Sequence, residues 1–170
     1  IIITSRVPYP LDKGDKLRIY HQIKYISKNN NIFLISLHHQ NIISKKDTKE
    51  LLKYCKEIFI IKISFINRVF NMLKSFVNNE PIQVGYFYSN KAHKKIQRII
   101  KKIKPNWCYF QLIRTSKYVN NNENNIIDYM DTFSKGIERR INNFPQLIRP
   151  LVKREFLITR NYETYTFNKF

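Results

Sequence analysis

The sequence predicts an α/β fold of the Rossmann-like, doubly wound type, with a mostly parallel sheet and helices on both faces. Short apolar and β-branched runs alternate with segments of helical periodicity, and short connections join them. This alternation is typical of parallel strands linked by right-handed crossovers. The strands are almost entirely apolar, which indicates a sheet covered on both sides. The 170 residues fit one domain.

The first part of the chain alternates strands with helices. A strand is expected over residues 1–4 and a helix over 15–29, with Asp15 as its cap and Leu17, Ile19, Ile23 and Ile26 near one face. The apolar stretches 31–39 and 57–63 predict two further strands, and a helix is expected between them over 46–55.

The second part begins with apolar residues at helical spacing over 64–77, a helix that Glu80-Pro81 ends. An irregular stretch over 82–89 and a helix over 90–103, capped by Asn90, should follow. Strands are expected over 107–113 and 126–130, separated by an Asn-rich loop over 120–125. From Ser134 on, the chain should be mostly helical, with breaks near Pro145 and Pro150.

The net charge of +19 predicts attraction to phosphate-bearing surfaces: nucleic acid, anionic lipid or a nucleotide. Lys, Asn, Ile, Tyr and Phe are abundant together and only three glycines occur, so codon bias in an AT-rich genome explains part of this charge. The sequence contains no helix-turn-helix, RNP, KH or zinc pattern. No apolar run approaches the ~18 residues of a transmembrane helix.

The two cysteines and four histidines do not form a metal-binding pattern. Cys55 and Cys108 lie in apolar runs without a spacing motif, which predicts two buried thiols in a reducing compartment. No histidine pair has ligand spacing, so the histidines are interpreted as structural or surface residues and no metal site is expected.

The turn between the first strand and the first helix is the strongest candidate for a ligand site, because ligands of such sheets bind at the carboxyl ends of the strands. Gly14 is expected to let a ligand approach the backbone closely and to adopt a positive φ. The helix N-terminus attracts anions, and Lys16, Arg18 and Arg6 add positive charge, so phosphate is the expected guest. No GxGxxG or P-loop motif occurs, and an ordinary turn with solvated Lys16 and Arg18 remains the alternative.

Several segments together resemble the N-terminal half of bacterial sugar transferases of glycosyltransferase family 4, in an exopolysaccharide-associated group. These segments are RVPYPLDKGDKLRIYH, LLKYCKEIFIIKI, NEPIQVGYFYS and IIDYMDTFS, followed by a final helical run with Arg154-Glu155 and Tyr162-Glu163. Each motif is weak alone, but their order and spacing match along nearly the whole chain.

The resemblance implies a GT-B enzyme with two Rossmann-like domains. Residues 1–170 would be the single N-terminal, acceptor-side domain, a fragment without the C-terminal donor domain and inactive alone. The whole enzyme would move a hexosyl group from a nucleotide-sugar to a glycan or lipid-linked acceptor in envelope or exopolysaccharide synthesis. Transfer would retain the anomeric configuration and need neither metal nor cofactor. The enzyme would be cytoplasmic, in contact with the inner face of the plasma membrane.

The resemblance also assigns roles to individual residues. Gly14 would lie near the donor phosphates, and Asp131 beside the transferred sugar as the catalytic residue. Asp128 lies three residues before Asp131, and Ser134 would cap the next helix. Arg114, at the end of the fourth strand, either binds phosphate or is solvated. Many relatives have a histidine where Asp128 and Asp131 stand, so the catalytic role stays open, and Asp131 as a helix cap or a partner of a lysine is the alternative.

Two other functions are compatible with the sequence. One is a basic nucleic-acid- or anion-binding α/β module without catalysis, which the charge favours. The other is a receiver-like binding domain, which the basic rather than acidic end of the first strand disfavours. The helix over 64–77 either lies on an anionic bilayer or packs against the sheet, and its sequence fits both.

Overall fold

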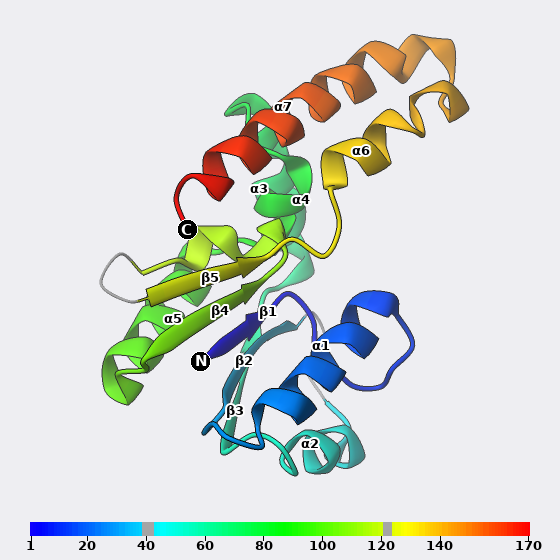
Figure 1. The fold of residues 1–170 in the computed structure, drawn as a ribbon. Coiled ribbons are helices and arrows are strands. Elements are labelled where there is room, and N and C mark those ends of the chain that lie inside the picture. The colour runs from blue at the N-terminus through cyan, green and yellow to red at the C-terminus, as the bar shows by residue number, and fades with distance from the viewer. Residues whose placement is uncertain (39–42, 121–123) are drawn as a thin grey trace.

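The computed structural model describes residues 1–38, 43–120 and 124–170 (Figure 1). Its centre is a five-stranded sheet in the order β3-β2-β1-β4-β5, and every neighbouring pair is parallel. The strands are β1 (Ile2–Thr4), β2 (Phe33–His38), β3 (Glu57–Lys62), β4 (Trp107–Gln111) and β5 (Asn124–Asp128). The predicted Rossmann-like α/β fold is therefore confirmed.

Helices surround the sheet and extend beyond its carboxyl edge (Figure 1). They are α1 (Gly14–Ile26), α2 (Lys45–Leu51), α3 (Phe65–Val77), α4 (Ile82–Phe87), α5 (Asn90–Ile103), α6 (Phe133–Glu138) and α7 (Arg149–Phe167). The 3₁₀ helix η1 (Ile113–Tyr118) follows β4, and η2 (Ile141–Asn143) and η3 (Gln146–Ile148) lie between α6 and α7.

The pleat of the strands divides the core between the two faces of the sheet. Ile2 packs with Ile19 and Ile23 of α1, whereas its neighbour Ile3 packs on the opposite face, where Ile96 of α5 lies. All five side chains are at most 4% exposed. Because alternate residues of one strand enter two different apolar clusters, the sheet is doubly covered, as the continuous apolar strands predicted.

Several expected helix ends are wrong by one or two positions. Lys13, not Asp15, precedes α1, since the Asp15 carboxylate is engaged by Arg6 instead. Ser89, not Asn90, caps α5 through its hydroxyl. Pro150 lies in the first turn of α7 rather than breaking it, because a proline there has no helical hydrogen bond to lose.

The stretch over 82–89, expected to be irregular, contains α4. Gly85 allows this short helix to pack directly on Ser75 of α3, so tertiary contact overrides the weak local signal. The expected loop over 120–125 is also partly wrong. Asn124 and Asn125 pair with Trp107 and Cys108 in the sheet and so begin β5 early. Residues 121–123 of that loop lie outside the described residues, as does His39 at the expected end of the second strand.

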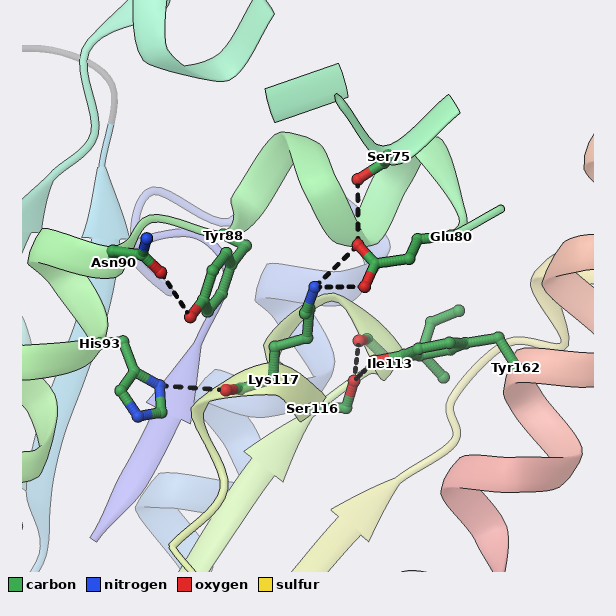
Figure 2. Close-up of polar contacts among 9 residues, drawn as sticks. All are labelled: Ser75, Glu80, Tyr88, Asn90, His93, Ile113, Ser116, Lys117 and Tyr162. Atoms are coloured by element: carbon green, nitrogen blue, oxygen red, sulfur yellow. Dashed lines mark hydrogen bonds and ion pairs between the residues drawn. The ribbon is translucent and has the colours of Figure 1, made fainter. Parts of the chain in front are cut away.

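Polar contacts fix the segment after β4 to the surrounding helices (Figure 2). The Lys117 ammonium donates to both oxygens of Glu80, at 2.7 and 2.8 Å, and lies 4.7 Å from the Tyr88 ring centroid. The Ser116 and Tyr162 hydroxyls are 2.8 Å apart, which attaches α7 to η1. These contacts hold the α3–α4 pair and α7 against the carboxyl edge of the sheet.

Helices α6 and α7 lie side by side beyond that edge (Figure 1). The Ser134 hydroxyl donates to the Glu163 carboxylate, and the Ser134 backbone N–H donates to the other oxygen of Glu163. Ser134 therefore does not cap α6 as expected: Thr132 occupies the cap position, and Ser134 is committed to the contact with α7.

Helix α3 presents its apolar side chains to solvent. Phe70 and Leu73 are 66% and 64% exposed, whereas the buried residues of the helix are Arg68 and Ser75. Of the two alternatives for this helix, packing of the apolar stripe against the sheet is therefore wrong.

Candidate functional site

The candidate site lies where the strand order reverses, between the neighbouring strands β1 and β4. In a doubly wound sheet, the crevice outside the carboxyl ends of these strands is the usual ligand position. Arg6 follows β1 by two residues, and Arg114 lies in η1, just after β4. The strand expected to end near Arg114 stops at Gln111, but Arg114 remains at the predicted edge.

A single carboxylate joins these two arginines. Asp15 Oδ2 accepts from Arg6 Nη1 at 2.8 Å and lies 3.5 Å from Arg114 Nη1. Gln111 Nε2 donates to the Asp15 carbonyl oxygen at 2.7 Å, which fixes the first turn of α1 to β4. Two guanidinium groups thus share one counter-charge, and the cluster keeps an excess positive charge.

The Arg114 side chain is held from several sides. Its Nε donates to Gln83 Oε1 at 2.9 Å, and its guanidinium carbon lies 4.8 Å from the Phe133 ring centroid and 5.2 Å from that of Phe87. Burial, and then the positive charge of Arg6, lower the pKa of Arg114 to about 10. Arg114 is therefore still a cation at neutral pH and is held in a fixed orientation, the state in which a guanidinium pairs best with an oxyanion.

A second ion pair crosses the same edge of the sheet. Arg18 Nη2 donates to Asp128 Oδ1 at 2.8 Å, which links α1 to the last residue of β5. Asp128 is therefore the partner of Arg18 and does not face a ligand alone.

Asp131 lies in the turn after β5, exposed and without a hydrogen-bond or ion-pair partner among the described residues. Its negative charge acts to raise the pKa of Arg114, although burial and Arg6 outweigh this effect. The alternative in which Asp131 pairs with a lysine or caps a helix has no support in the described contacts, because Thr132 is the residue before α6.

Gly14 differs from its expected role in one respect. It is the first residue of α1 and is exposed, but no glycine in the described part of the chain has a positive φ. A Cβ built on Gly14 would meet only Met130 Cε, at an ordinary 3.8 Å. The prediction of a left-handed backbone is therefore wrong, and no internal contact requires a glycine here.

A cleft of about 600 Å³ opens beside this cluster, between the turn after β1, the end of β2, and helices α3 and α4. Of the predicted site residues, Arg6 and Lys16 line it, and Lys16 is paired with Asp12 at 2.7 Å. The other predicted residues do not line it: Gly14, Arg18, Arg114, Asp128 and Asp131. Gly14 and Arg18 lie in the first two turns of α1, and the other three lie at or just after the ends of β4 and β5.

Sequence reasoning missed Arg68, which enters the same cleft from α3, and Asp15 as the shared counter-ion. The sequence shows only that Arg68 belongs to an amphipathic helix. It does not show that the apolar side of this helix faces solvent, which is why Arg68 points inward. Asp15 was interpreted as a helix cap because of its position near a helix start.

Comparison of the chain with family models, with curated proteins and with solved structures found no match. Within residues 1–38, 43–120 and 124–170, no three His, Cys, Asp or Glu side chains gather in a way that could hold a metal ion. No helix in the described part of the chain is both long enough and apolar enough to cross a membrane.

Proposed function

We propose that this chain is the acceptor-side domain of a retaining glycosyltransferase of the GT-B type. Its enzyme would transfer a hexosyl group from a nucleotide-sugar to a glycan or lipid-linked acceptor in envelope polysaccharide synthesis. The resemblance to glycosyltransferase family 4 supplies the reaction, and the second domain of such an enzyme would supply most of the donor site.

The observation that carries the proposal is the convergence of the resembling segments on one edge of the sheet. The KGDKLR turn meets the IIDYMDTFS segment through the ion pair of Arg18 and Asp128. The NEPIQVGYFYS segment joins the KGDKLR turn through Arg114, which donates to Gln83 and lies 3.5 Å from the Asp15 carboxylate. Segments far apart in the sequence thus form one polar cluster at the switch point of the sheet, where doubly wound folds bind ligands.

The chemistry of the cluster fits this reaction. In retaining transfer the bond between the sugar C1 and the diphosphate oxygen breaks, a bond from C1 to the acceptor oxygen forms, and the acceptor proton passes to the departing phosphate. Preorganised cations lower the cost of the charge on that diphosphate. Arg6 and Arg114 would supply such cations, and the exposed carboxylate of Asp131 would face the transferred sugar.

The test is transfer by the full-length gene product, assayed with several nucleotide-sugars and lipid-linked acceptors. Arg114→Gln and Asp131→Asn should each lower kcat about 10²-fold or more, as loss of a charge-stabilising group at the reacting centre does. Lys102→Gln, on the far exposed face of α5, is the control for loss of one charge and should leave kcat unchanged. Full activity in both site variants would remove this edge of the sheet from the mechanism.

We further propose that α3 rests on an anionic membrane surface. Its outward side chains form an apolar face in which each is between 37% and 79% exposed: Phe65, Ile66, Val69, Phe70, Leu73, Phe76 and Val77. Lys74 lies on the same helix, and the Arg154 guanidinium stacks on Phe76 with 4.3 Å between the guanidinium carbon and the ring centroid. An apolar face beside cations fits acyl chains together with negatively charged headgroups.

Co-sedimentation with lipid vesicles tests this contact. Binding is expected to vesicles that contain phosphatidylglycerol and to be weak on pure phosphatidylcholine. Phe70→Ser with Leu73→Ser should abolish it at unchanged stability, because both side chains are mostly exposed. The control, Lys95→Gln on α5, should bind normally. Equal binding of the double variant would exclude α3 as the contact.

The second candidate function, a nucleic-acid- or anion-binding module without catalysis, is favoured by the outer face of α5. Its basic residues are all exposed: Lys91, Lys94, Lys95, Arg98, Lys101 and Lys102. DNA binding that falls steeply with salt, is independent of sequence and is lost when these residues become glutamine would favour this module. Absence of DNA binding at low salt would eliminate its nucleic-acid form.

A further inference from the structure

Arg68 is a buried cation with no ion-pair partner among the residues that the structure describes. It points inward from α3 and is 2% exposed. Its Nε and Nη2 atoms are buried and form no hydrogen bond within the described part of the chain. These two nitrogens share one edge of the planar guanidinium, and that edge matches two oxygens of a carboxylate or phosphate. A buried charge left unpaired is costly, so an arginine in this state calls for an anion.

The surroundings of Arg68 orient its guanidinium but do not neutralise it. The guanidinium carbon lies 4.9 Å from the ring centroid of Tyr86 and 5.5 Å from that of Phe87. Arg6 and Arg114 also approach the Phe87 ring, at 5.9 and 5.2 Å. Aromatic faces attract cations but carry no net charge. Three guanidinium groups therefore gather around one phenylalanine.

Three carboxylates lie near Arg68 or line its cleft, those of Asp12, Asp15 and Asp47, and none forms an ion pair with Arg68. Asp15 is engaged by Arg6 and Arg114, and Asp12 by Lys16. None of these carboxylates contacts Arg68, which has no ion-pair partner among the described residues. Arg68 therefore adds a buried positive charge to a cluster in which two arginines already share one carboxylate.

Arg68 also lines an accessible volume. The cleft of about 600 Å³ is bounded by Arg68, Arg6 and Lys13 on its basic side and by Tyr86 and Phe87 on its aromatic side. This volume fits a small organic ligand, and cavities of this kind hold one or two sugar-sized groups. Aromatic rings beside cations suit a ligand with both an apolar ring face and an anionic group.

We propose that Arg68 is the anion-binding residue of an oxyanion site in this cleft, and that the ligand is a sugar carrying a carboxylate or a phosphate. Oxyanion binding follows from the unpaired guanidinium and the cleft alone. That the sugar is part of the acceptor rests on the proposed function. In that case the enzyme selects an anionic acceptor on its N-terminal domain, separately from the donor diphosphate.

Equilibrium binding to the purified chain tests the site without any transfer reaction. The probes are glucuronate, glucose 6-phosphate and inorganic phosphate, with glucose as the uncharged analogue, followed by calorimetry and by the shift of Tm. At least one charged sugar should bind in a saturable way and raise Tm, while glucose should not. The stronger of glucuronate and glucose 6-phosphate identifies which oxyanion the site takes.

Variants distinguish oxyanion binding at Arg68 from nonspecific attraction to the positive charge of the chain. Arg68→Met should weaken binding by about tenfold or more, the loss expected for a bidentate charged hydrogen-bond pair. Lys102→Gln removes one exposed charge from α5 and should change affinity less than about twofold, since salt screens a distant surface charge. Arg68→Lys keeps the charge but loses the two-pronged edge, and so should also bind weakly.

The stability of the unliganded variants gives a second readout. Because Arg68→Met removes an unpaired buried charge, its Tm without ligand should equal or exceed that of the wild type. A lower Tm with unchanged oxyanion affinity would make Arg68 a packing residue and overturn the proposal. Failure of every charged probe to bind the wild type, or equal losses in Arg68→Met and Lys102→Gln, would overturn it as well. If oxyanions bind through Arg68 but the full-length protein transfers no sugar, this site stands and the proposed function fails.

Discussion

Gly85 in α4 lies directly against Ser75 in α3, with no room for a side chain between the two helices. A Cβ built on Gly85 would clash with the Ser75 side chain and lie 2.8 Å from the carbonyl oxygen of Asn71. The close crossing holds α3 on α4, so that Arg68 of α3 lies over Tyr86 and Phe87 of α4. Lys117 and Glu80 then fix this helix pair to the segment after β4 (Figure 2).

We therefore expect Gly85→Ala to lower the free energy of unfolding by about 1–3 kcal/mol, the usual cost of overpacking, because part of the obstruction is backbone that cannot rotate away. Urea denaturation measures the change. Gly136→Ala in α6 is the matched control: its new Cβ would meet only the flexible end of Arg140, at 3.6 Å, and alanine favours the helix. Equal effects of the two substitutions would contradict the tight crossing.

Gly14 offers the opposite case, a glycine that the fold itself does not require. Its φ is not positive and a Cβ there has space, so Gly14→Ala should keep the fold and raise the free energy of unfolding by up to about 1 kcal/mol. If a ligand approaches this turn closely, the same variant should lose transferase activity in the full-length enzyme. Unfolding curves and kcat/KM together separate the two effects. Full activity in a stable Gly14→Ala variant would remove the turn from ligand binding.

Asp15 is expected to be important for stability, because it is the shared counter-charge of Arg6 and Arg114. Asp15→Asn keeps the shape of the side chain but removes its charge. It should lower the free energy of unfolding by about 1–2 kcal/mol, a figure that allows for solvent screening of the partly exposed Arg6. Denaturant titration measures it, with the exposed Glu57→Gln as control. An unchanged free energy of unfolding would mean that the fold does not need the Asp15 charge to offset Arg6 and Arg114.

The sequence predicted the fold well because its strands are strongly apolar and its connections are short. The alternation of Ile2 and Ile3 between two cores, and the buried face of α5, follow from pattern alone. The short helix α4 could not be predicted in this way. It depends on the contact of Gly85 with Ser75, two residues that are not neighbours in the sequence.

The candidate site was only partly predictable, for a similar reason. Topology brings Arg6 and Arg114 to one edge of the sheet, and this much follows from strand order. Which charges neutralise one another is a matter of side-chain geometry: Asp128 pairs with Arg18, and Asp15 joins two arginines. Arg68 enters the cleft only because α3 turns its apolar side outward, against the usual orientation of an amphipathic helix.

Glu155 in α7 provides a prediction about pH. Its Oε1 accepts from the Ile82 backbone N–H at 2.8 Å, whereas its Oε2 is buried and has no hydrogen-bond partner in the described part of the chain. Burial raises the pKa of Glu155 above its ordinary value of 4.5, despite the opposing effect of the Ile82 hydrogen bond. The folded state thus binds this proton more tightly than the unfolded state does.

The sign of the effect follows from that difference. The stabilisation from the protonated carboxyl is complete below the unfolded pKa, near 4.5, and is lost as pH rises through the higher folded pKa. Glu155→Gln mimics the protonated form at every pH and keeps an oxygen for the Ile82 N–H. The variant should therefore be more stable than the wild type at pH 7, and this advantage should shrink as the pH falls toward 4.5. Urea denaturation of both proteins across this range measures it, and an advantage that does not change with pH would show that the Glu155 carboxylate ionises in the fold without penalty.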